Sequence, residues 1–263
     1  MSRRWQQVRH QLRRNRPAQF SLFVLFIFVI AALCAGLSPY DPDRMALGAR
    51  TLPPDAAHWF GTDEYGRDYF TRALYGGQIS LMVGFLAMLF STLIGTVVGT
   101  VSGYFGGWLD NLMMRAVDIL MAIPAFFLLL VVNAYLKPGV DNIILIISLL
   151  TWMNMSRLVR AETLSVKERE YVLYARASGE HPLRIIVRHI IPGVLPTIIV
   201  AATLNIASAI LMESTLSFLG LGVQAPAASW GSMLNNAQSY IGEASWLAMF
   251  PGILILLTVF SFN

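Results

Sequence analysis

The sequence predicts an all-α integral membrane protein with six transmembrane helices and with both termini in the cytoplasm. Of the 263 residues, 56% are hydrophobic and only 13% are charged, whereas soluble domains carry about 25% charged residues. A helix needs about 20 mainly apolar residues to cross a bilayer. Six windows provide such a stretch: residues 20–37, 79–101, 116–136, 142–155, 193–211 and 246–262.

The first window follows a basic stretch, residues 1–19, and this order is also typical of a secretory signal peptide. Leu33 precedes Cys34, where cleavage of a lipoprotein signal would need a small residue, and five further windows follow. These features favour an uncleaved anchor helix at 20–37. Cys34 is the only cysteine, so an internal disulfide is excluded.

The distribution of Lys and Arg predicts the orientation, because cytoplasmic loops accumulate these residues. Fourteen of the 19 lie before the first window, between the second and third, or between the fourth and fifth. The other side holds Arg44, Arg50, Arg67, Arg72 and Lys137. We therefore expect a cytoplasmic N-terminus on residues 1–19 and a cytoplasmic segment at 157–192.

Residues 38–78 are expected to form an extracytoplasmic loop, since "SPYDPD", "LPPD" and "GTDEYGRD" are rich in turn residues. Residues 214–244 form a second outer loop with Gly and Pro punctuation. The rest of the chain, residues 79–263, is expected to be a five-helix core that contains the cytoplasmic segment 157–192.

This cytoplasmic segment reads as two short helices joined by a turn. Apolar residues share one face of a helix between residues 164 and 177, namely Leu164, Tyr171, Val172 and Ala175. Gly179 then permits a left-handed turn, and Pro182 starts the second helix. Pro192 and Pro196 are expected to mark the start of the fifth transmembrane helix.

Two interpretations of the segment stay open. An amphipathic helix can rest on the lipid headgroups, with its arginines near anionic lipid. However, Leu173, Tyr174 and Ala177 are apolar and project away from the first face. A short helix with apolar residues on more than one side favours docking to a partner protein.

The string "EYVLYARASGEHPLRIIVRHIIP" resembles the cytoplasmic EAA loop of bacterial ABC-importer permease subunits, in which a Gly is followed thirteen residues later by a Pro. Here these residues are Gly179 and Pro192. Over nearly its whole length the chain is similar to the oligopeptide and dipeptide branch of these permeases. The matching strings are "HWFGTDEYGRDYFTRALYGGQISLMVG", "SGYFGGWLDNLMMRAVDILMAIP", "ESTLSFLGLGVQAPAASWGSML" and "FPGILILLTVFSFN".

The chain departs from that family pattern at two places. The Glu-Ala-Ala triplet falls on Leu173, Tyr174 and Ala175, so only the last alanine is retained, although Glu170 is close by. The branch usually continues past the last helix with a short polar tail, whereas this sequence stops at Asn263.

The resemblance implies a type I ABC-importer permease that imports peptides across a bacterial inner membrane. It implies four partners: a homologous second permease, two cytoplasmic ATPases that bind ATP and Mg²⁺, and an extracytoplasmic binding protein. Membrane lipid would surround the helices, and no nucleic acid is expected. The residues that it implies for coupling to an ATPase are Glu170, Tyr171, Val172, Leu173, Tyr174, Ala175, Ala177, Gly179 and Pro192.

Catalytic chemistry is not expected in this chain. A phosphate-binding loop needs a Lys after a Gly-rich turn, and neither lysine, Lys137 or Lys167, has that context. The sequence contains no HExxH motif and no paired cysteines, and its four histidines are scattered. We therefore expect no enzyme activity, no cofactor and no metal.

Polar groups within membrane helices are costly and often functional. The candidates for a translocation path are Asp118, Asn133, Asn205 and Glu213. Hydrogen bonding between helices is the alternative for the two asparagines, and a local pair with Arg115 is the alternative for Asp118.

Small residues recur at every fourth position of the second helix, at Ser91, Gly95, Gly99 and Gly103. Such a stripe predicts close packing against a helix of this chain or of a partner permease.

Two rival functions stay open. An ion-coupled secondary transporter would need Pro- or Gly-interrupted helices at matching positions in two halves, and the sequence shows no such symmetry. The same ABC machine could also carry nickel, glutathione or an opine.

Overall fold

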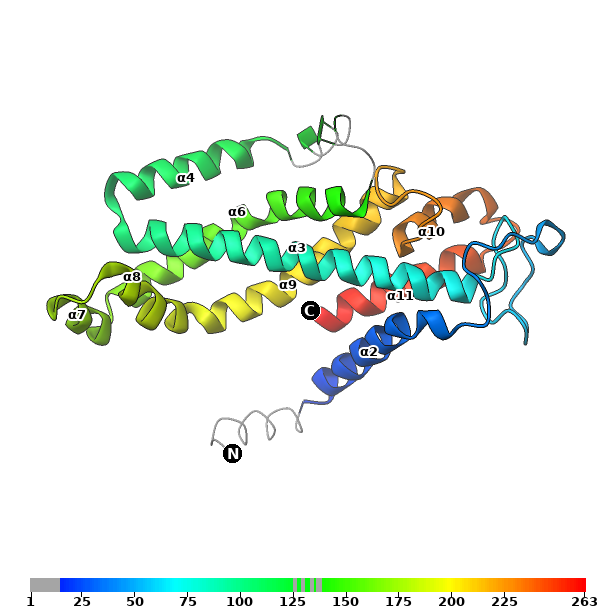
Figure 1. The fold of residues 1–263 in the computed structure, drawn as a ribbon, viewed down its shortest axis with the longest axis horizontal. Helices are drawn as coiled ribbons and strands as arrows, with labels where there is room; N and C mark the ends of the chain where they lie inside the picture. The colour runs from blue at the N-terminus through cyan, green and yellow to red at the C-terminus, as the bar shows by residue number, and fades with distance from the viewer. Residues whose placement is uncertain (1–14, 125–126, 129–130, 133–134, 136–138) are drawn as a thin grey trace. The chain divides into compact units, whose positions relative to one another are not determined.

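The computed structural model describes residues 15–124, 127–128, 131–132, 135 and 139–263. Apart from an isolated β-bridge between Thr62 and Asp68, the regular structure of this part of the chain is helical. Its α-helices, shown in Figure 1, are α2 (Arg16–Leu33), α3 (Tyr69–Phe105), α4 (Gly107–Ala122), α6 (Val140–Lys167), α7 (Glu170–Ala177), α8 (Pro182–Ile185), α9 (Ile191–Phe218), α10 (Trp230–Ala237) and α11 (Trp246–Phe262).

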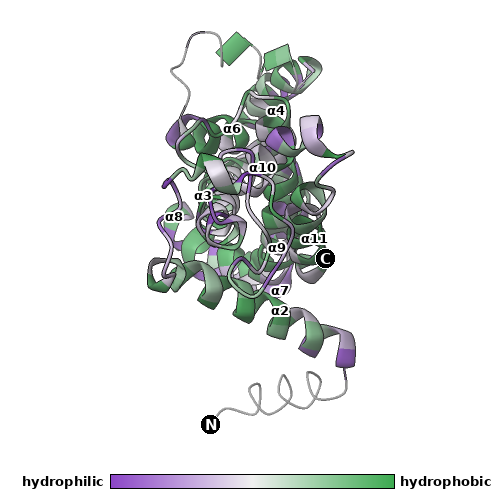
Figure 2. Ribbon diagram, turned by 90° about the vertical axis from the view of Figure 1, so that its right-hand side faces the viewer, coloured by the Kyte–Doolittle hydropathy of each residue, from purple (hydrophilic) through white to green (hydrophobic). Residues whose placement is uncertain are grey.

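Four helical segments of the described residues are long and apolar enough to cross a membrane: α2, α3, α6 and the run Pro182–Phe218. Figure 2 shows hydrophobic residues over much of the length of the helices. The sixth predicted window coincides with α11, which is apolar and 17 residues long. The third window, 116–136, overlaps the end of α4 and then falls partly outside the described residues. The helices satisfy their own backbone hydrogen bonds, as a membrane segment must.

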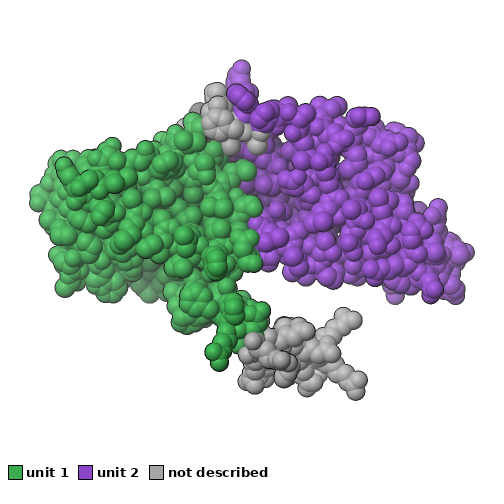
Figure 3. Space-filling model, turned by 180° about the vertical axis from the view of Figure 1, so that it is seen from behind, with its two compact units in different colours: residues 1–84, 138–140, 207–263 green, residues 85–137, 141–206 purple. Residues whose placement is uncertain are grey.

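The chain divides into two compact units, which Figure 3 distinguishes by colour. Unit 1 comprises residues 1–84, 138–140 and 207–263, and unit 2 comprises residues 85–137 and 141–206. The helices α3 and α9 each begin in one unit and end in the other.

The core of unit 1 forms where α10 packs against the first turns of α3. The indole N–H of Trp230 donates to the carbonyl oxygen of Ala73 at 2.9 Å, and the backbone N–H of Trp230 donates to the Ser80 hydroxyl at 3.2 Å. Gly77 allows this contact, because a Cβ there would lie 3.0 Å from Cζ2 of Trp230. Tyr69 extends the core to α11 by donating to the carbonyl oxygen of Leu247 at 2.6 Å.

The segment between α2 and α3 is held by ion pairs that include buried charges. Nε of Arg67 donates to Asp63 at 2.6 Å, and Nη1 of Arg72 donates to Asp43 at 3.1 Å. Burial, together with the neighbouring Asp63, raises the pKa of the Glu64 carboxyl. Buried charges require partners, so this segment is a folded part of unit 1 rather than an open loop.

α3 begins at Tyr69, nine residues before the predicted end of the loop at residue 78. Asp68 caps this helix, because its carboxylate accepts from the backbone N–H and the hydroxyl of Thr71, each at 2.7 Å. The last residues of the predicted loop are therefore helical. The helix extends beyond its apolar stretch because Asp68 fixes the first turn.

In unit 2, α3 and α6 approach closely along the stripe of small residues. A Cβ added at Gly95 would lie 2.6 Å from the Cβ of Met155, and one added at Gly103 would lie 2.8 Å from the Cβ of Thr163. Ser91, on the same stripe, is fully buried. Glycine lets two helix backbones approach this closely, so the structure places these glycines against another helix of the same chain.

Candidate functional site

The candidate site is α7 together with the helices that support it. α6 ends at Lys167, and α7 begins after Arg169, whose backbone is extended with φ −72° and ψ 143°. The helix expected between residues 164 and 177 is therefore two helices. The prediction missed this break because the apolar pattern continues across Arg169.

A turn at Gly179 ends α7. The backbone N–H of Gly179 donates to the Arg176 carbonyl oxygen and that of Glu180 donates to the Ala175 carbonyl oxygen, each at 3.1 Å. These two bonds form a Schellman motif, which needs a left-handed residue after the helix. Gly179 has φ +76°, as the sequence predicted, and a Cβ at this position would meet no atom within 4 Å. The constraint on residue 179 is therefore conformational and not steric.

One face of α7 is part of the core of unit 2. Val172 and Ala175 are buried and pack in a cluster with Val166 of α6, Ile185 of α8 and Ile190. This cluster fixes α7 on the ends of α6 and α9.

The opposite face of α7 is exposed and apolar. Tyr171, Leu173 and Tyr174 are 42%, 44% and 76% exposed, and Ala177 and Glu170 are also exposed. The sequence had placed Leu173, Tyr174 and Ala177 away from the core face, and the structure agrees. Tyr171 was expected on the buried face, yet its ring reaches the surface although its hydroxyl lies near Gly193.

The second half of the segment is continuous with the following helix. α8, a π-helical turn at Ile186–Ile190 and α9 form one apolar helical run, Pro182–Phe218. Pro192 is the second residue of α9, as expected for the start of this helix, but the helical run continues on its N-terminal side. The π turn, in which Ile191 N–H donates five residues back to the Ile186 carbonyl oxygen, accommodates the missing proline N–H.

A polar contact closes the turn between α7 and α8. Nε2 of His189 lies 3.1 Å from a carboxylate oxygen of Glu180, and Nε of Arg184 lies 3.9 Å from the other oxygen. His181 begins α8, where its side chain accepts from the Leu183 N–H. Two of the scattered histidines are thus structural side chains of this turn.

A second polar cluster lies at the same end of unit 2, where α3 ends and α4 begins. Nε and Nη2 of Arg160 in α6 donate, each at 2.6 Å, to Oδ1 and Oδ2 of Asp110 in α4. The Ser102 hydroxyl also donates to Asp110, and Lys167 donates to the Gly103 carbonyl oxygen at 3.1 Å. Arg160 and Ser102 hold the pKa of Asp110 below its usual value.

The sequence did not single out this cluster, since Asp110 and Arg160 are 50 residues apart. The string "GGWLD" just outside an apolar window was the available signal, because an acidic residue there needs a basic partner. The cluster joins the short connection between α3 and α4 to the C-terminal part of α6, the helix that precedes α7.

The described residues among the predicted path candidates have different surroundings. Asp118 is exposed and pairs with Arg157 of α6, and not with Arg115. Asn205 is half-buried on α9, and Asn133 lies outside the described residues.

Glu213, the fourth candidate, is fully buried in unit 1 among serine hydroxyls. Ser80 of α3 donates to its Oε2 at 2.9 Å, Ser217 donates to its Oε1 at 2.7 Å, and Ser214 lies 3.4 Å from Oε2. This carboxyl group therefore links α3 to α9 in an enclosed site.

The described residues contain no group of three or more His, Cys, Asp or Glu side chains that could hold a metal ion.

Comparison with known proteins agrees with this architecture. Residues 95–263 match the family of binding-protein-dependent transport system inner membrane components. The chain belongs to this family. Residues 3–54 also match the N-terminal transmembrane domain of oligopeptide transport permease C. These matches confirm the resemblance seen in the sequence and place the protein in the inner membrane.

Curated relatives cover almost the whole of this inner membrane component. The dipeptide transport system permease protein DppC of Bacillus subtilis (strain 168) is 43% identical over 96% of this chain and 80% of its own length. The oligopeptide transport system permease protein OppC of Escherichia coli (strain K12) is 41% identical over 98% of this chain and 87% of its own length.

A solved structure shows the same fold. A chain of the MetNI methionine ABC transporter, in inward facing conformations, matches with a TM-score of 0.62 and 20% identity. The match covers 73% of this inner membrane component and 91% of that chain. It confirms the predicted all-helical fold of an ABC-importer membrane subunit.

Proposed function

We propose that this inner membrane component is the permease subunit of an ATP-driven importer of peptides and that α7 docks to its ATPase. The observation that carries the proposal is the two-sided character of α7. Val172 and Ala175 fix the helix to unit 2, while Leu173 and Tyr174 present an apolar surface that the described part of the chain leaves uncovered. The names of the dipeptide and oligopeptide permease relatives support peptides as cargo.

The proposed complex has the partners that such an importer needs: a second permease, two ATPases that bind ATP and Mg²⁺, and an extracytoplasmic binding protein. This chain would carry no catalytic residue of its own. The excess of Lys and Arg around residues 157–192 supports a cytoplasmic position for α7.

In the proposed mechanism, closure of the ATPases displaces α7. Because Val172 and Ala175 pack against Val166, Ile185 and Ile190, the displacement would pass to the end of α6 and to the start of the run Pro182–Phe218. Such rigid-body movement of helices is a common basis of alternating states.

Asp118 and Asn205 are proposed to face the translocation path, and Asn133 is retained on its sequence alone. The enclosure of Glu213 by serines supports a packing role for that residue instead.

The test changes the turn after α7 without changing its contacts. A residue with a Cβ in the left-handed conformation costs about 1–2 kcal/mol, and a β-branched residue is a marked outlier there. Since nothing would touch the new Cβ, we expect Gly179→Val to redirect α8, to abolish transport and to weaken co-purification of the ATPase. Gly179→Asn is the matched control, because asparagine tolerates this conformation. It should retain most of the transport activity and most of the co-purified ATPase.

A second control distinguishes docking from resting on lipid. The double variant Arg184→Gln and Arg188→Gln removes exposed charges and should leave co-purification unchanged, because exposed ionic contacts are weak. The segment would be a membrane-surface anchor if the arginine variant lost ATPase binding while Gly179→Val, inserted in the membrane, still bound the ATPase normally.

A further inference from the structure

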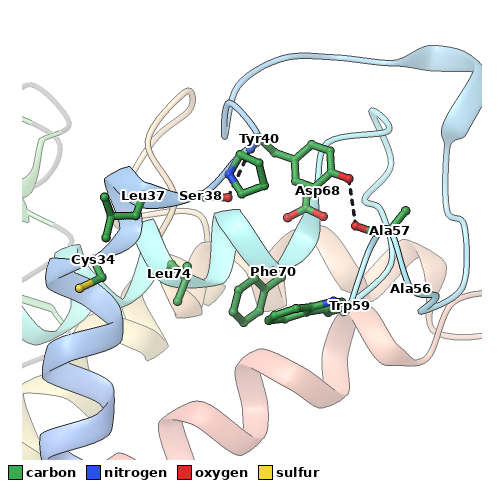
Figure 4. Close-up of a pocket in the computed structure, with 11 residues that line it drawn as sticks. Cys34, Leu37, Ser38, Tyr40, Ala56, Ala57, Trp59, Asp68, Phe70 and Leu74 are labelled. Atoms are coloured by element: carbon green, nitrogen blue, oxygen red, sulfur yellow. Dashed lines mark hydrogen bonds between the residues drawn. The ribbon is translucent and has the colours of Figure 1, made fainter.

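A cavity of about 430 Å³ lies in unit 1, where α2 ends and α3 begins. Figure 4 shows the residues that line it. Its size is within the range of about 300–1,000 Å³ that small-molecule sites occupy. It is far in sequence from α7 and has no part in the proposed coupling.

The walls of the cavity are held by specific contacts. The Tyr40 hydroxyl donates to the Ala57 carbonyl oxygen at 3.0 Å, the dashed line on the right of Figure 4. The rings of Trp59 and Phe70 pack with centroids 5.0 Å apart. The three aromatic rings therefore belong to an ordered wall.

The cavity has two chemically different ends. Cys34, Leu37 and Leu74 lie together on the left of Figure 4, next to the last turn of α2, and form an apolar end. Asp68 lies on the right, in this view between the Tyr40 ring and the ring pair of Trp59 and Phe70.

Among the described residues that line the cavity, Asp68 alone carries a charged side chain. It is 5% exposed. Oδ2 accepts two hydrogen bonds from Thr71, and within the described part of the chain Oδ1 contacts His58 Nδ1 at 2.8 Å. A carboxylate oxygen can accept more than one hydrogen bond, so Oδ1 can accept a further N–H donor.

We propose that this cavity binds the ammonium headgroup of a membrane phospholipid, with phosphatidylethanolamine as the simplest ligand. Aromatic faces and a carboxylate are the groups that recognise organic ammonium ions. The apolar end continues from the membrane helix α2, so an acyl chain can follow α2 while the headgroup reaches Asp68. An amphipathic ligand with a cationic head fits both ends.

The single cysteine of the chain provides the probe, since Cys34 is exposed and lines the apolar end. The full-length protein is placed in nanodiscs of phosphatidylglycerol alone. The rate constants of Cys34 with a trimethylammonium methanethiosulfonate and with a sulfonate analogue are measured, each normalised to a small free thiol. We expect the ratio of the cationic to the anionic rate to fall by roughly threefold to tenfold in Asp68→Asn, because one unit charge is removed.

Asparagine caps helices as well as aspartate does, so Asp68→Asn removes the charge and keeps the first turn of α3. Trp59→Leu, which replaces a side chain that is 65% exposed, should lower the ratio as well. Glu243→Gln is the matched control, because it removes an exposed carboxylate of the same unit that does not line the cavity. It should leave the ratio unchanged.

The lipid itself is tested by mixing phosphatidylethanolamine into the nanodiscs, which should slow labelling of Cys34 by both reagents in the wild type but not in Asp68→Asn. Soluble glycerophosphoethanolamine, which lacks acyl chains, should protect much less. Equal ratios in wild type, Asp68→Asn and Trp59→Leu would overturn the proposal. Protection by the soluble amine but not by the lipid would also overturn it, because the ligand would then be a free ammonium compound.

Discussion

Replacing Gly99 with alanine should destabilise the contact between α3 and α6. A Cβ at this position would lie 2.5 Å from the Ser156 carbonyl oxygen, 2.8 Å from the Val159 Cβ and 2.9 Å from the Arg160 backbone nitrogen. Two of these three atoms are backbone and cannot rotate away, so the helices would have to separate.

The magnitude follows from two opposing effects. Overpacking of a close contact costs about 1–3 kcal/mol, whereas alanine is a better helix former than glycine by about 0.8–1.0 kcal/mol. Gly252 isolates the first effect, because it lies in α11 with no atom within 4 Å of an added Cβ. Gly99→Ala should thus be about 1–3 kcal/mol less stable than Gly252→Ala.

The assay is thermal unfolding of a fluorescent fusion in detergent, followed by size-exclusion chromatography. For a chain of this size, 1 kcal/mol shifts the melting temperature by about 2–4 °C, so the two variants should differ by roughly 2–12 °C. If Gly99→Ala melts at or above the temperature of Gly252→Ala, the close approach of α3 and α6 is refuted.

Three further outcomes are expected. Asp110→Asn should lower the melting temperature at pH 7 by breaking the pair with Arg160; because that pair lowers the pKa of Asp110, the difference from wild type should shrink as the pH falls below 3.8. Glu64→Gln should raise the melting temperature at pH 7, because burial raises the pKa of Glu64 and disfavours its ionised form. Melting temperatures measured at decreasing pH should show this difference from wild type becoming smaller towards pH 4.5. In a cysteine-free background, a cysteine at Asp55 should react with an impermeant thiol reagent added to intact cells and one at Ser178 should not; the reverse result would contradict the proposed orientation.

Composition and periodicity were sufficient to predict the helical class of this protein and to assign Leu173 and Tyr174 to the exposed face of α7. The apolar window 246–262 coincides with α11, and Leu173 and Tyr174 are exposed where their spacing placed them. Both features are local, because a stretch of side chains decides them without reference to the rest of the chain.

Features that depend on backbone details or on distant residues were missed. The break at Arg169 interrupts no apolar pattern, and the sequence did not indicate the π turn that joins α8 to α9 before Pro192. The partner of Asp118 was sought at Arg115, one turn away, but is Arg157 of another helix. No spacing rule in one sequence indicates such a contact.

The serine cluster around Glu213 has a consequence for biosynthesis. α9 is synthesised before α10. Glu213 therefore reaches the membrane before Trp230, whose backbone N–H donates to Ser80 in the folded protein, has been made. An ionisable side chain in an inserting helix is costly when it has no polar partner. Ser217 lies one helical turn further along and donates to Glu213 at 2.7 Å. The nascent helix therefore contains one hydrogen-bond donor for this carboxyl group. It can enter the bilayer before the later segments have been made.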